Sequence, residues 1–212
     1  MSRRSKLLNS LLWRYATKKF DSAKKLSDTE LNELLEVLRL APSSFGLQPY
    51  KFIVVTNQDL RNKLRENAWN QAQVTDASHL IVLATRTDVN KEYVTNYVKH
   101  IANTRKLPVN ALKSYEDNVI NLVNSMTKDQ VLEWCKKQTY ITLGALIVAA
   151  AEKQIDMCPM EGFNVQKFDE LLKLKEKNLT STIICPVGFR ADDDYAKLAK
   201  VRFNKEDIVV LN

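Results

Sequence analysis

Five short segments of the sequence place cations or amide side chains beside expected turns. They are Arg14 to Lys18 (RYATK), Pro42 to Pro49 (PSSFGLQP), Asn70 to Gln73 (NQAQ), Pro159 to Gly162 (PMEG) and Lys200 to Arg202 (KVR). The planar guanidinium of arginine suits paired hydrogen bonds to the oxygens of an anion, and amide side chains both donate and accept. Each segment alone also occurs on ordinary turns and solvated faces, so only their combination indicates a binding site.

The overall charge of the chain is also suited to an anionic partner. The sequence has 32 lysines and arginines against 25 acids, a net charge of +7, and an isoelectric point of about 9.2. The sign of this charge does not choose between a nucleic acid and a phosphorylated small molecule. However, the basic residues are interleaved with acids, without a block of about five or six like charges. The pattern weakens the nucleic-acid alternative and leaves it open.

Metal chemistry and membrane insertion are not indicated. Cys135, Cys158 and Cys185 form no Cys-x-x-Cys pair, and with two histidines the chain offers no zinc-ligand pattern. No apolar run approaches the ~20 residues of a membrane span, and the first residues lead into no signal-peptide core. We therefore expect no metal, no membrane partner and a cytoplasmic location. Only four glycines and five prolines are present, so flexible linkers are scarce and we expect one domain over 1–212.

Hydrophobic periodicity predicts a series of helices and strands. Two capping boxes, at Ser27 with Glu30 and at Thr127 with Gln130, predict the starts of two helices. The expected helices span 5–15, 28–41, 59–67, 91–103, 115–125 and 128–153, and the expected strands span 50–56, 79–87, 179–187 and 207–211. Because helices and strands alternate, we expect an α/β or α+β protein with a sheet covered by helices.

The second half of the longest expected helix has an unusual composition. Residues 141–151 (ITLGALIVAAA) are apolar around the whole helix. A helix of that kind has to be buried on every side. In a chain of 212 residues, we expect it at the centre of the molecule or at a subunit interface.

Taken in order, the five segments resemble the motifs of the nitroreductase family. The family's Arg-Tyr-Ser-x-(Lys/Arg)-x-Phe corresponds to 14–20, and its Ala-Pro-Ser-Ser-x-x-x-Gln-Pro corresponds to 41–49. The motif Asn-x-x-(Lys/Gln) followed by Asp-Ala-Ser-His is found at 70–79. The late Pro-x-Glu-Gly-Phe is found at 159–163, and the closing Lys-x-Arg at 200–202. The resemblance therefore covers nearly the whole chain.

This resemblance implies an α+β, nitroreductase-like fold with a central, mostly antiparallel sheet covered by helices, in an intertwined homodimer. It implies an FMN cofactor, reduced by NADH or NADPH and reoxidised by a nitroaromatic, a quinone or a similar acceptor. Hydride passes through flavin N5 in a ping-pong cycle. The absence of G-x-G-x-x-G from the sequence fits a nicotinamide that stacks briefly on the flavin. The alternatives are specialisation for another acceptor, such as a pteridine or an enone, and a basic nucleic-acid-binding protein without a cofactor.

The resemblance also assigns residues to the FMN phosphate. Arg14, Lys200 and Arg202 would hold the phosphate, although they are far apart in the sequence. Charge-assisted hydrogen bonds of this kind contribute about 1.5–3 kcal/mol each. Ser43 and Ser44 would add donors from the opposite subunit.

The flavin ring is assigned to a second group of residues. Lys18 would stabilise the negative charge that reduction places on the N1–C2=O edge of the ring. Asn70 and Gln73 would bind the pyrimidine edge, and backbone N–H groups near Glu161 and Gly162 would face N5 and O4. No catalytic side chain is expected, because the flavin performs the chemistry. The remaining cofactor contacts are expected at Tyr15, Ala16, Pro42, Gly46, Pro159 and Met160.

Three of these positions depart from the family pattern. Ala16 replaces the usual serine, Gly46 stands where several relatives have asparagine, and Gln73 stands where the best-known members have lysine. The sequence therefore predicts FMN binding without predicting the preferred acceptor.

Overall fold

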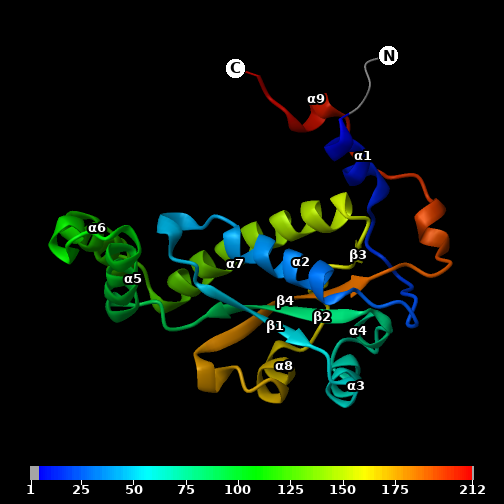
Figure 1. Cartoon of the computed structure of the whole chain (residues 1–212), viewed down its shortest axis with the longest axis horizontal. Coiled ribbons are helices and arrows are strands. Elements are labelled where there is room, and N and C mark those ends of the chain that lie inside the picture. Colours follow the sequence, from blue (N-terminus) through cyan, green and yellow to red (C-terminus); the bar gives the residue numbers. More distant parts are fainter. Residues whose placement is uncertain (1–4, 212) are drawn as a thin grey trace.

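The computed structural model describes residues 5–211, and in it helices cover both faces of a small sheet (Figure 1). All helices and strands expected before residue 188 are present, with ends shifted by one or a few residues. The α-helices are α1 (Lys6–Trp13), α2 (Asp28–Leu40), α3 (Gln58–Glu66), α4 (Gln73–Asp76), α5 (Lys91–Arg105), α6 (Lys113–Asn124), α7 (Lys128–Glu152), α8 (Val165–Leu171) and α9 (Lys205–Ile208). The strands are β1 (Tyr50–Val55), β2 (His79–Arg86), β3 (Asp156–Met157) and β4 (Leu179–Gly188), and the short 3-10 helices are η1 (Ser44–Gly46), η2 (Val109–Leu112), η3 (Lys175–Lys177) and η4 (Asp194–Lys197).

The sheet has the strand order β1-β2-β4-β3, and each neighbouring pair is antiparallel. Strand β2 pairs with β4 along its whole length, and the register shifts between Leu83 and Ala84. The prediction of a mostly antiparallel sheet in an α+β fold is confirmed.

Side-chain alternation along β2 divides the core into two layers. Because successive side chains of a strand point to opposite faces, Ile81 and Leu83 face one core cluster. Leu34 of α2 and Leu146 of α7 belong to that cluster. The opposite face of the sheet is covered by α3 and α8 (Figure 1), and its cluster includes Leu64, Leu80, Val82 and Phe168. Both faces of β2 are therefore buried, which explains its almost continuous apolar sequence.

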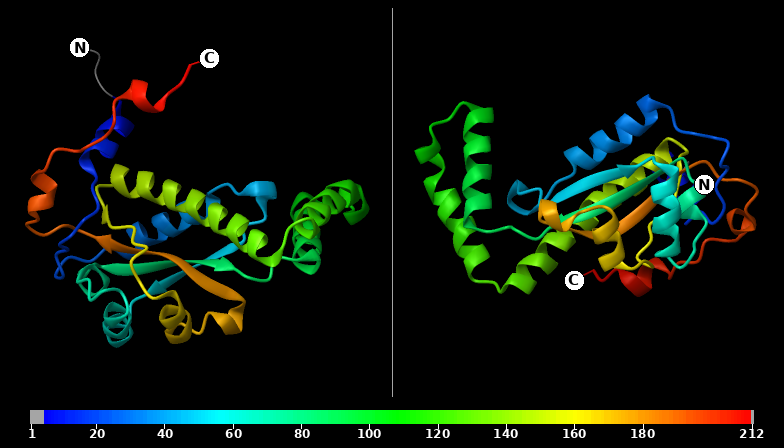
Figure 2. Two further views of the ribbon diagram at one scale, coloured as in Figure 1. Left: turned by 180° about the vertical axis from the view of Figure 1, so that it is seen from behind. Right: turned by 90° about the horizontal axis from the view of Figure 1, so that it is seen from below.

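Helices α5 and α6 project beyond one end of the sheet (Figure 2). Their own small core is formed by Val94, Val98 and Val119, together with Cys135 at the beginning of α7. Helices α1 and α9 lie together, away from this arm (Figure 1), and neither contains a buried residue. The arm and the terminal segments therefore occupy different parts of the molecule.

The apolar half of α7 is buried on only one side within the chain. Leu143, Leu146 and Ala150 are buried in the core, whereas Ile141 and Gly144 are exposed. The expectation that residues 141–151 are enclosed on every side is thus not met by a single chain. The exposed side leaves an apolar surface, which is the feature expected of a subunit interface.

The structure corrects the expected strand at 207–211. This segment contains the end of the short helix α9, and no strand occurs within residues 189–211. The cause is local, because the side chains of Asn204 and Asp207 form a reciprocal capping box that starts the helix. The sequence analysis also missed α4, α8 and β3, which are too short to show a clear period. None of the helices within residues 5–211 has the length and apolar character to cross a bilayer.

Candidate functional site

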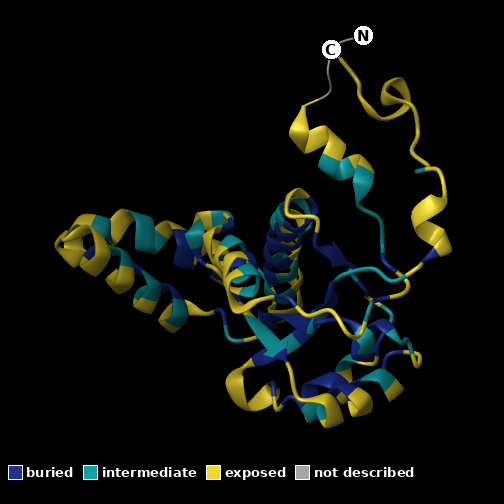
Figure 3. Cartoon of the chain, turned by 45° about the vertical axis from the view of Figure 1, so that its right-hand side comes forward, coloured by how far each residue is buried: buried dark blue, intermediate teal, exposed yellow. Residues whose placement is uncertain are grey.

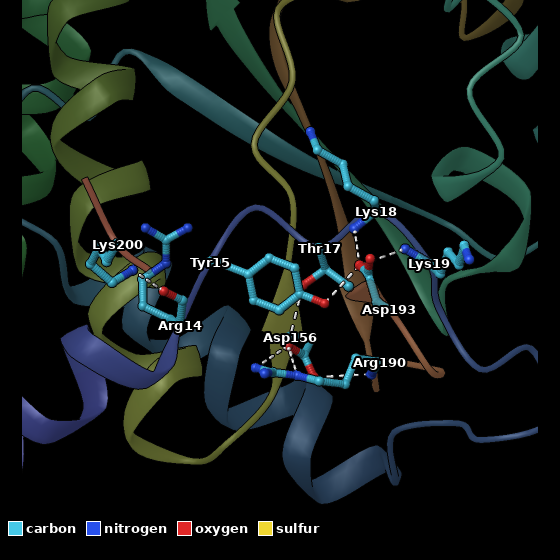
Figure 4. Close-up of polar contacts among 9 residues, drawn as sticks. All are labelled: Arg14, Tyr15, Thr17, Lys18, Lys19, Asp156, Arg190, Asp193 and Lys200. Carbon is cyan, nitrogen blue, oxygen red and sulfur yellow. Dashed lines mark hydrogen bonds and ion pairs between the residues drawn. The ribbon is translucent and has the colours of Figure 1, made fainter. Parts of the chain in front are cut away.

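Both ends of the chain contribute to one cationic hollow of about 450 Å³. Arg14 follows α1, whereas Lys200 and Arg202 follow η4 in the C-terminal segment. The Lys200 ammonium donates a hydrogen bond to the backbone carbonyl of Arg14 (Figure 4). Tyr15, Ala16 and Lys18 line the same hollow. Six of the residues expected to bind the cofactor thus lie together, although up to 188 positions separate them in the sequence (202 − 14).

Electrostatic repulsion among these cations indicates that the hollow suits an anion. Burial lowers the pKa of Arg14, and the charge of Arg202 lowers this pKa further. Burial likewise lowers the pKa of Lys200, and the charges of Arg14 and Arg202 act in the same direction. The buried Nε of Arg14 has no hydrogen-bond partner among residues 5–211. An anion in the hollow would satisfy this donor and reduce the repulsion.

A buried carboxylate, Asp193, fixes the N-terminal wall of the hollow (Figure 4). Its Oδ2 accepts hydrogen bonds from the Tyr15 hydroxyl at 2.7 Å and from the backbone N–H groups of Lys18 at 2.9 Å and Lys19 at 3.1 Å. Its Oδ1 accepts from the N–H of Tyr195 at 3.1 Å. Burial raises the pKa of Asp193, but these hydrogen bonds outweigh burial and leave the pKa lowered. Asp193 therefore ties the Arg14–Lys18 segment to the segment that leads to Lys200.

A second buried carboxylate, Asp156 in the edge strand β3, holds the same wall in place. It accepts from the Thr17 hydroxyl at 3.2 Å, and from the backbone N–H and Nε of Arg190 at 2.9 and 2.8 Å. The Arg190 guanidinium lies 4.1 Å from the ring centroid of Trp13 and 4.7 Å from that of Tyr15. These contacts hold both residues that flank Arg14 in the sequence.

The Pro159–Gly162 segment begins next to the cationic hollow. The charges of Lys18 and Arg14 oppose the rise in the pKa of Cys158 that burial causes, so both cations lie near this thiol. After Cys158, the chain runs beside β4, where Met160 and Ile184 exchange two backbone hydrogen bonds of 2.8 and 3.0 Å. Pro159, Met160, Glu161 and Gly162 consequently continue from the hollow along the sheet.

Gly162 in turn contacts the Asn70–Gln73 segment. A Cβ at position 162 would overlap the ring of Trp69, and the Gln71 amide donates to the Gly162 carbonyl at 3.1 Å. Gln73 is buried, whereas Asn70 is exposed, and its Oδ1 accepts from Arg65 at 3.1 Å. The absence of a side chain at Gly162 therefore lets the Trp69 ring lie directly against the backbone.

The Pro42–Gly46 loop lies elsewhere, on the opposite side of α7. The N–H of Ser44 donates to Gln138 Oε1 at 2.8 Å, whereas the Tyr140 hydroxyl donates to the Glu161 carboxylate. Positions two apart in a helix point roughly 200° apart, so Gln138 and Tyr140 face opposite ways. Within one chain, Pro42, Ser43, Ser44 and Gly46 are therefore separated from the other expected cofactor contacts.

The chain belongs to the nitroreductase family. The model of that family matches residues 11–189, which include four of the five motif segments. The Bacillus subtilis protein YfkO, named as an NAD(P)H nitroreductase, is 35% identical over 97% of this chain and 97% of its own length. A Staphylococcus epidermidis protein of the same designation, SERP2086, is 35% identical over 96% of this chain and 95% of its own. The family suggested by the motifs is therefore confirmed.

Solved structures agree on the fold. A nitroreductase from Exiguobacterium sibiricum, in complex with FMN, has a TM-score of 0.85 with 18% identity over 100% of this chain and 99% of that chain. The enone reductase CLA-ER from gut-bacterial fatty acid metabolism has a TM-score of 0.83 with 18% identity over 98% of both chains. At such identities the match concerns the fold alone, and it confirms the predicted nitroreductase-like fold.

Four residues of the site were missed by the sequence analysis: Asp156, Asp193, Trp69 and Tyr140. Asp156 could have been found, because it is one acid inside the apolar run 155–158, and a buried acid needs a partner. Asp193 stands among three consecutive aspartates, a pattern typical of a solvated loop. No local signal distinguishes it from its neighbours.

Proposed function

We propose that this chain is an FMN-dependent oxidoreductase that takes electrons from NADH or NADPH and passes them to small acceptors such as nitroaromatics or quinones. The convergence of Arg14, Lys200 and Arg202 on one hollow carries the proposal. The names of YfkO and SERP2086 support the nicotinamide donor, and the FMN complex of the Exiguobacterium protein supports the cofactor.

The cationic hollow fits the terminal phosphate of FMN. A phosphate monoester carries about −1.5 to −2 charges at neutral pH, which complements three converging cations. The buried Nε of Arg14, without a partner among the described residues 5–211, gives the phosphate a directional donor. In this proposal Arg14, Lys200 and Arg202 bind the phosphate, and Ala16 contributes no hydroxyl to it.

The remaining residues near the hollow would bind and tune the flavin ring. When bound, FMN supplies hydride transfer between the nicotinamide and the acceptor. Lys18 provides a fixed positive charge, which favours the electron-rich edge of the ring. Asn70 and Gln73 donate and accept through their amides, and the close backbone at Gly162 supplies N–H groups without a side chain in the way.

The proposal includes a homodimer in which each site uses two chains. The loop with Ser43 and Ser44 lies on the far side of α7 from Glu161, so a second copy would have to supply it. The exposed side of the apolar helix, which includes Ile141 and Gly144, is suited to such a contact. Obligate interfaces of this kind typically bury more than about 2,000 Å².

Replacing a phosphate ligand tests the proposed function. Arg202→Ala should weaken FMN retention by about 1.5–3 kcal/mol, or roughly ten- to a hundredfold. The measurement is the flavin content of the purified yellow protein before and after dialysis. Lys205→Ala, which removes a cation three positions further on, is the matched control and should retain flavin. Full flavin in Arg202→Ala after dialysis would contradict the assignment of the hollow.

A further inference from the structure

A second hollow, of about 340 Å³, lies at the other end of the molecule. It is enclosed by the η1 loop on one side and by α5, η2 and α6 on the other. Its lining includes Phe45 and Gly46 from the loop, Tyr97 and Arg105 from α5, and Tyr115 from α6. It is therefore separate from the cationic hollow, and none of the described residues lines both.

The walls of this aromatic hollow are mainly apolar. Phe45 and Tyr115 meet edge to face, with ring centroids 6.2 Å apart and planes at 64°. Ile101 and Leu112 complete the apolar lining. A space of this size, bounded by aromatic rings, suits a small planar ring, because rings stack or meet edge to face with favourable geometry.

Among the residues that the structure describes, Arg105 is the only charged one that lines the aromatic hollow. Burial raises the pKa of Tyr97 and of Tyr115, and the charge of Arg105 opposes the rise at both, so its guanidinium lies near hydroxyls of two different helices. Among residues 5–211, no salt bridge or side-chain hydrogen bond involves Arg105. The guanidinium is thus available to an anionic group at the mouth of the hollow.

Gly46 adapts the loop to this hollow. Its φ of +66° lies in the left-handed region, and a Cβ at this position would overlap the Tyr97 hydroxyl. A larger residue would push Tyr97 out of the wall. Gly46 therefore shapes the aromatic hollow, in the same loop that we assign to the cofactor of the opposite subunit.

We propose that the aromatic hollow is the acceptor subsite for planar aromatic molecules that carry a negative charge, with Arg105 binding the anionic group. The ring of the acceptor lies against Tyr97 and Phe45, and its carboxylate or similar group faces the guanidinium. This inference rests on the proposed function, because the loop beside the hollow has to meet the cofactor of the opposite subunit.

The test compares two acceptors of similar size and different charge, 4-nitrobenzoate and 4-nitrobenzyl alcohol. With the flavin-loaded dimer and NADH or NADPH, we expect a higher kcat/KM for 4-nitrobenzoate. Arg105→Gln should lower the ratio of the two kcat/KM values by roughly tenfold, as loss of one charge-assisted contact implies. Lys106→Gln, the adjacent cation that does not line the hollow, should leave the ratio within about twofold.

Direct binding separates this inference from the proposed function. Calorimetric titration with benzoate needs no turnover, and Arg105→Gln should weaken binding by a similar factor. If the wild type binds benzoate in this way but reduces no acceptor, the proposed function fails and the anion site stands. An unchanged acceptor ratio in Arg105→Gln overturns the acceptor assignment. So does a rise in KM confined to NADPH, which would assign Arg105 to a nicotinamide phosphate.

Discussion

The two hollows of this protein are built in opposite ways. The cationic hollow joins segments from the two chain ends, and its surroundings are mostly exposed (Figure 3). The aromatic hollow is formed by the η1 loop together with α5, η2 and α6, and the arm of α5 and α6 has its own core. Like charges repel, so the first needs buried carboxylates as a frame, whereas the second is held by ordinary apolar packing. The difference suggests a rigid site for a permanent cofactor and a more adaptable one for acceptors.

The backbone around each hollow is also fixed by different partners. At the cationic hollow, Asp193 accepts from backbone N–H groups. At the aromatic hollow, tyrosine hydroxyls donate to backbone carbonyls: Tyr115 to Phe45, and Tyr93 to Leu47 at 2.7 Å. The loop needs such contacts because Phe45 and Gln48 have positive φ values of 53° and 50°, which cost energy in residues other than glycine.

The largest expected effect comes from separating the two chains of the proposed dimer, which would move the cationic hollow of one chain away from the loop and aromatic hollow of the other. Gly144 is exposed on α7, and a Cβ there would meet nothing within 4 Å in the chain. Gly144→Glu should therefore leave the folded chain intact while placing a charge in the proposed interface. We expect loss of the dimer and of the flavin together, because each site would lose its second chain. Sedimentation velocity and the flavin absorbance measure both.

A charge elsewhere on the surface provides the control. Asn62→Glu on α3, on the opposite face of the sheet from α7, should keep the dimer and the yellow colour. Leu146 would be a poor choice for this test, because it is fully buried in the core of the single chain. A Gly144→Glu dimer with normal flavin content would contradict the shared site.

The second prediction affects the cationic hollow alone. Asp193→Asn removes the charge, and its amide N–H₂ group has to face at least one of the four donors that now converge on the two carboxylate oxygens. We expect the free energy of unfolding to fall by about 3 kcal/mol, since hydrogen bonds to charged groups contribute roughly 1.5–3 kcal/mol each. FMN retention should fall as well, while benzoate binding at the aromatic hollow should remain. Chemical denaturation and the two binding measurements test this separation.

The lowered pKa of Asp193 adds a pH dependence to this prediction. A carboxylate with a lowered pKa in the folded state stabilises the protein above its unfolded pKa, near 3.9. That contribution is lost as the pH falls through the folded value. The stability difference between wild type and Asp193→Asn should thus shrink on acidification below about pH 4. A difference that stays constant would mean that the carboxylate charge is not the cause.

The sequence predicted the elements better than it predicted their assembly. Residues 79–87 and 179–187 form strands because their apolar side chains can be buried on both faces, a signal within one segment. The prediction of a strand at 207–211 was wrong because it also relied on a signal within one segment: Val209 and Val210 favour a strand locally. The capping pair of Asn204 and Asp207 starts a helix there instead.

The residues that assemble the site were harder to predict than those that line it. Arg14 and Lys200 could be assigned from motifs, but their meeting depends on Asp193, whose partners in the N-terminal segment lie 174 to 178 positions away. Periodicity has no means of finding such pairings. The position of Ser44 on the far side of α7 likewise follows only from the three-dimensional path of the chain.

A smaller effect is expected from the tyrosine contacts of the aromatic hollow. Tyr115→Phe removes the hydrogen bond to the Phe45 carbonyl and should cost about 1 kcal/mol of stability. Hydrogen exchange at the Gly46 and Leu47 amides should become faster, while FMN retention falls only slightly. Tyr93→Phe removes the equivalent contact to Leu47 and is the comparison variant. Unchanged exchange in both variants would show that apolar packing alone holds the loop.

The smallest expected effect concerns the protonation of the cationic hollow. The pKa of Lys200 is lowered by burial and then by Arg14 and Arg202, so it lies below the usual value of about 10.4. A bound phosphate favours the charged ammonium, and FMN affinity should therefore decrease as the pH rises through the pKa of free Lys200. The phosphate is already a dianion above its second pKa, near 6, so it contributes no change in this range. Lys200→Arg keeps its charge and should show a weaker decrease between neutral pH and a pH just below the usual lysine pKa of about 10.4. The dissociation constant of FMN, followed by flavin fluorescence at both pH values, gives the comparison. Equal slopes for wild type and Lys200→Arg would mean that Lys200 does not titrate against the phosphate.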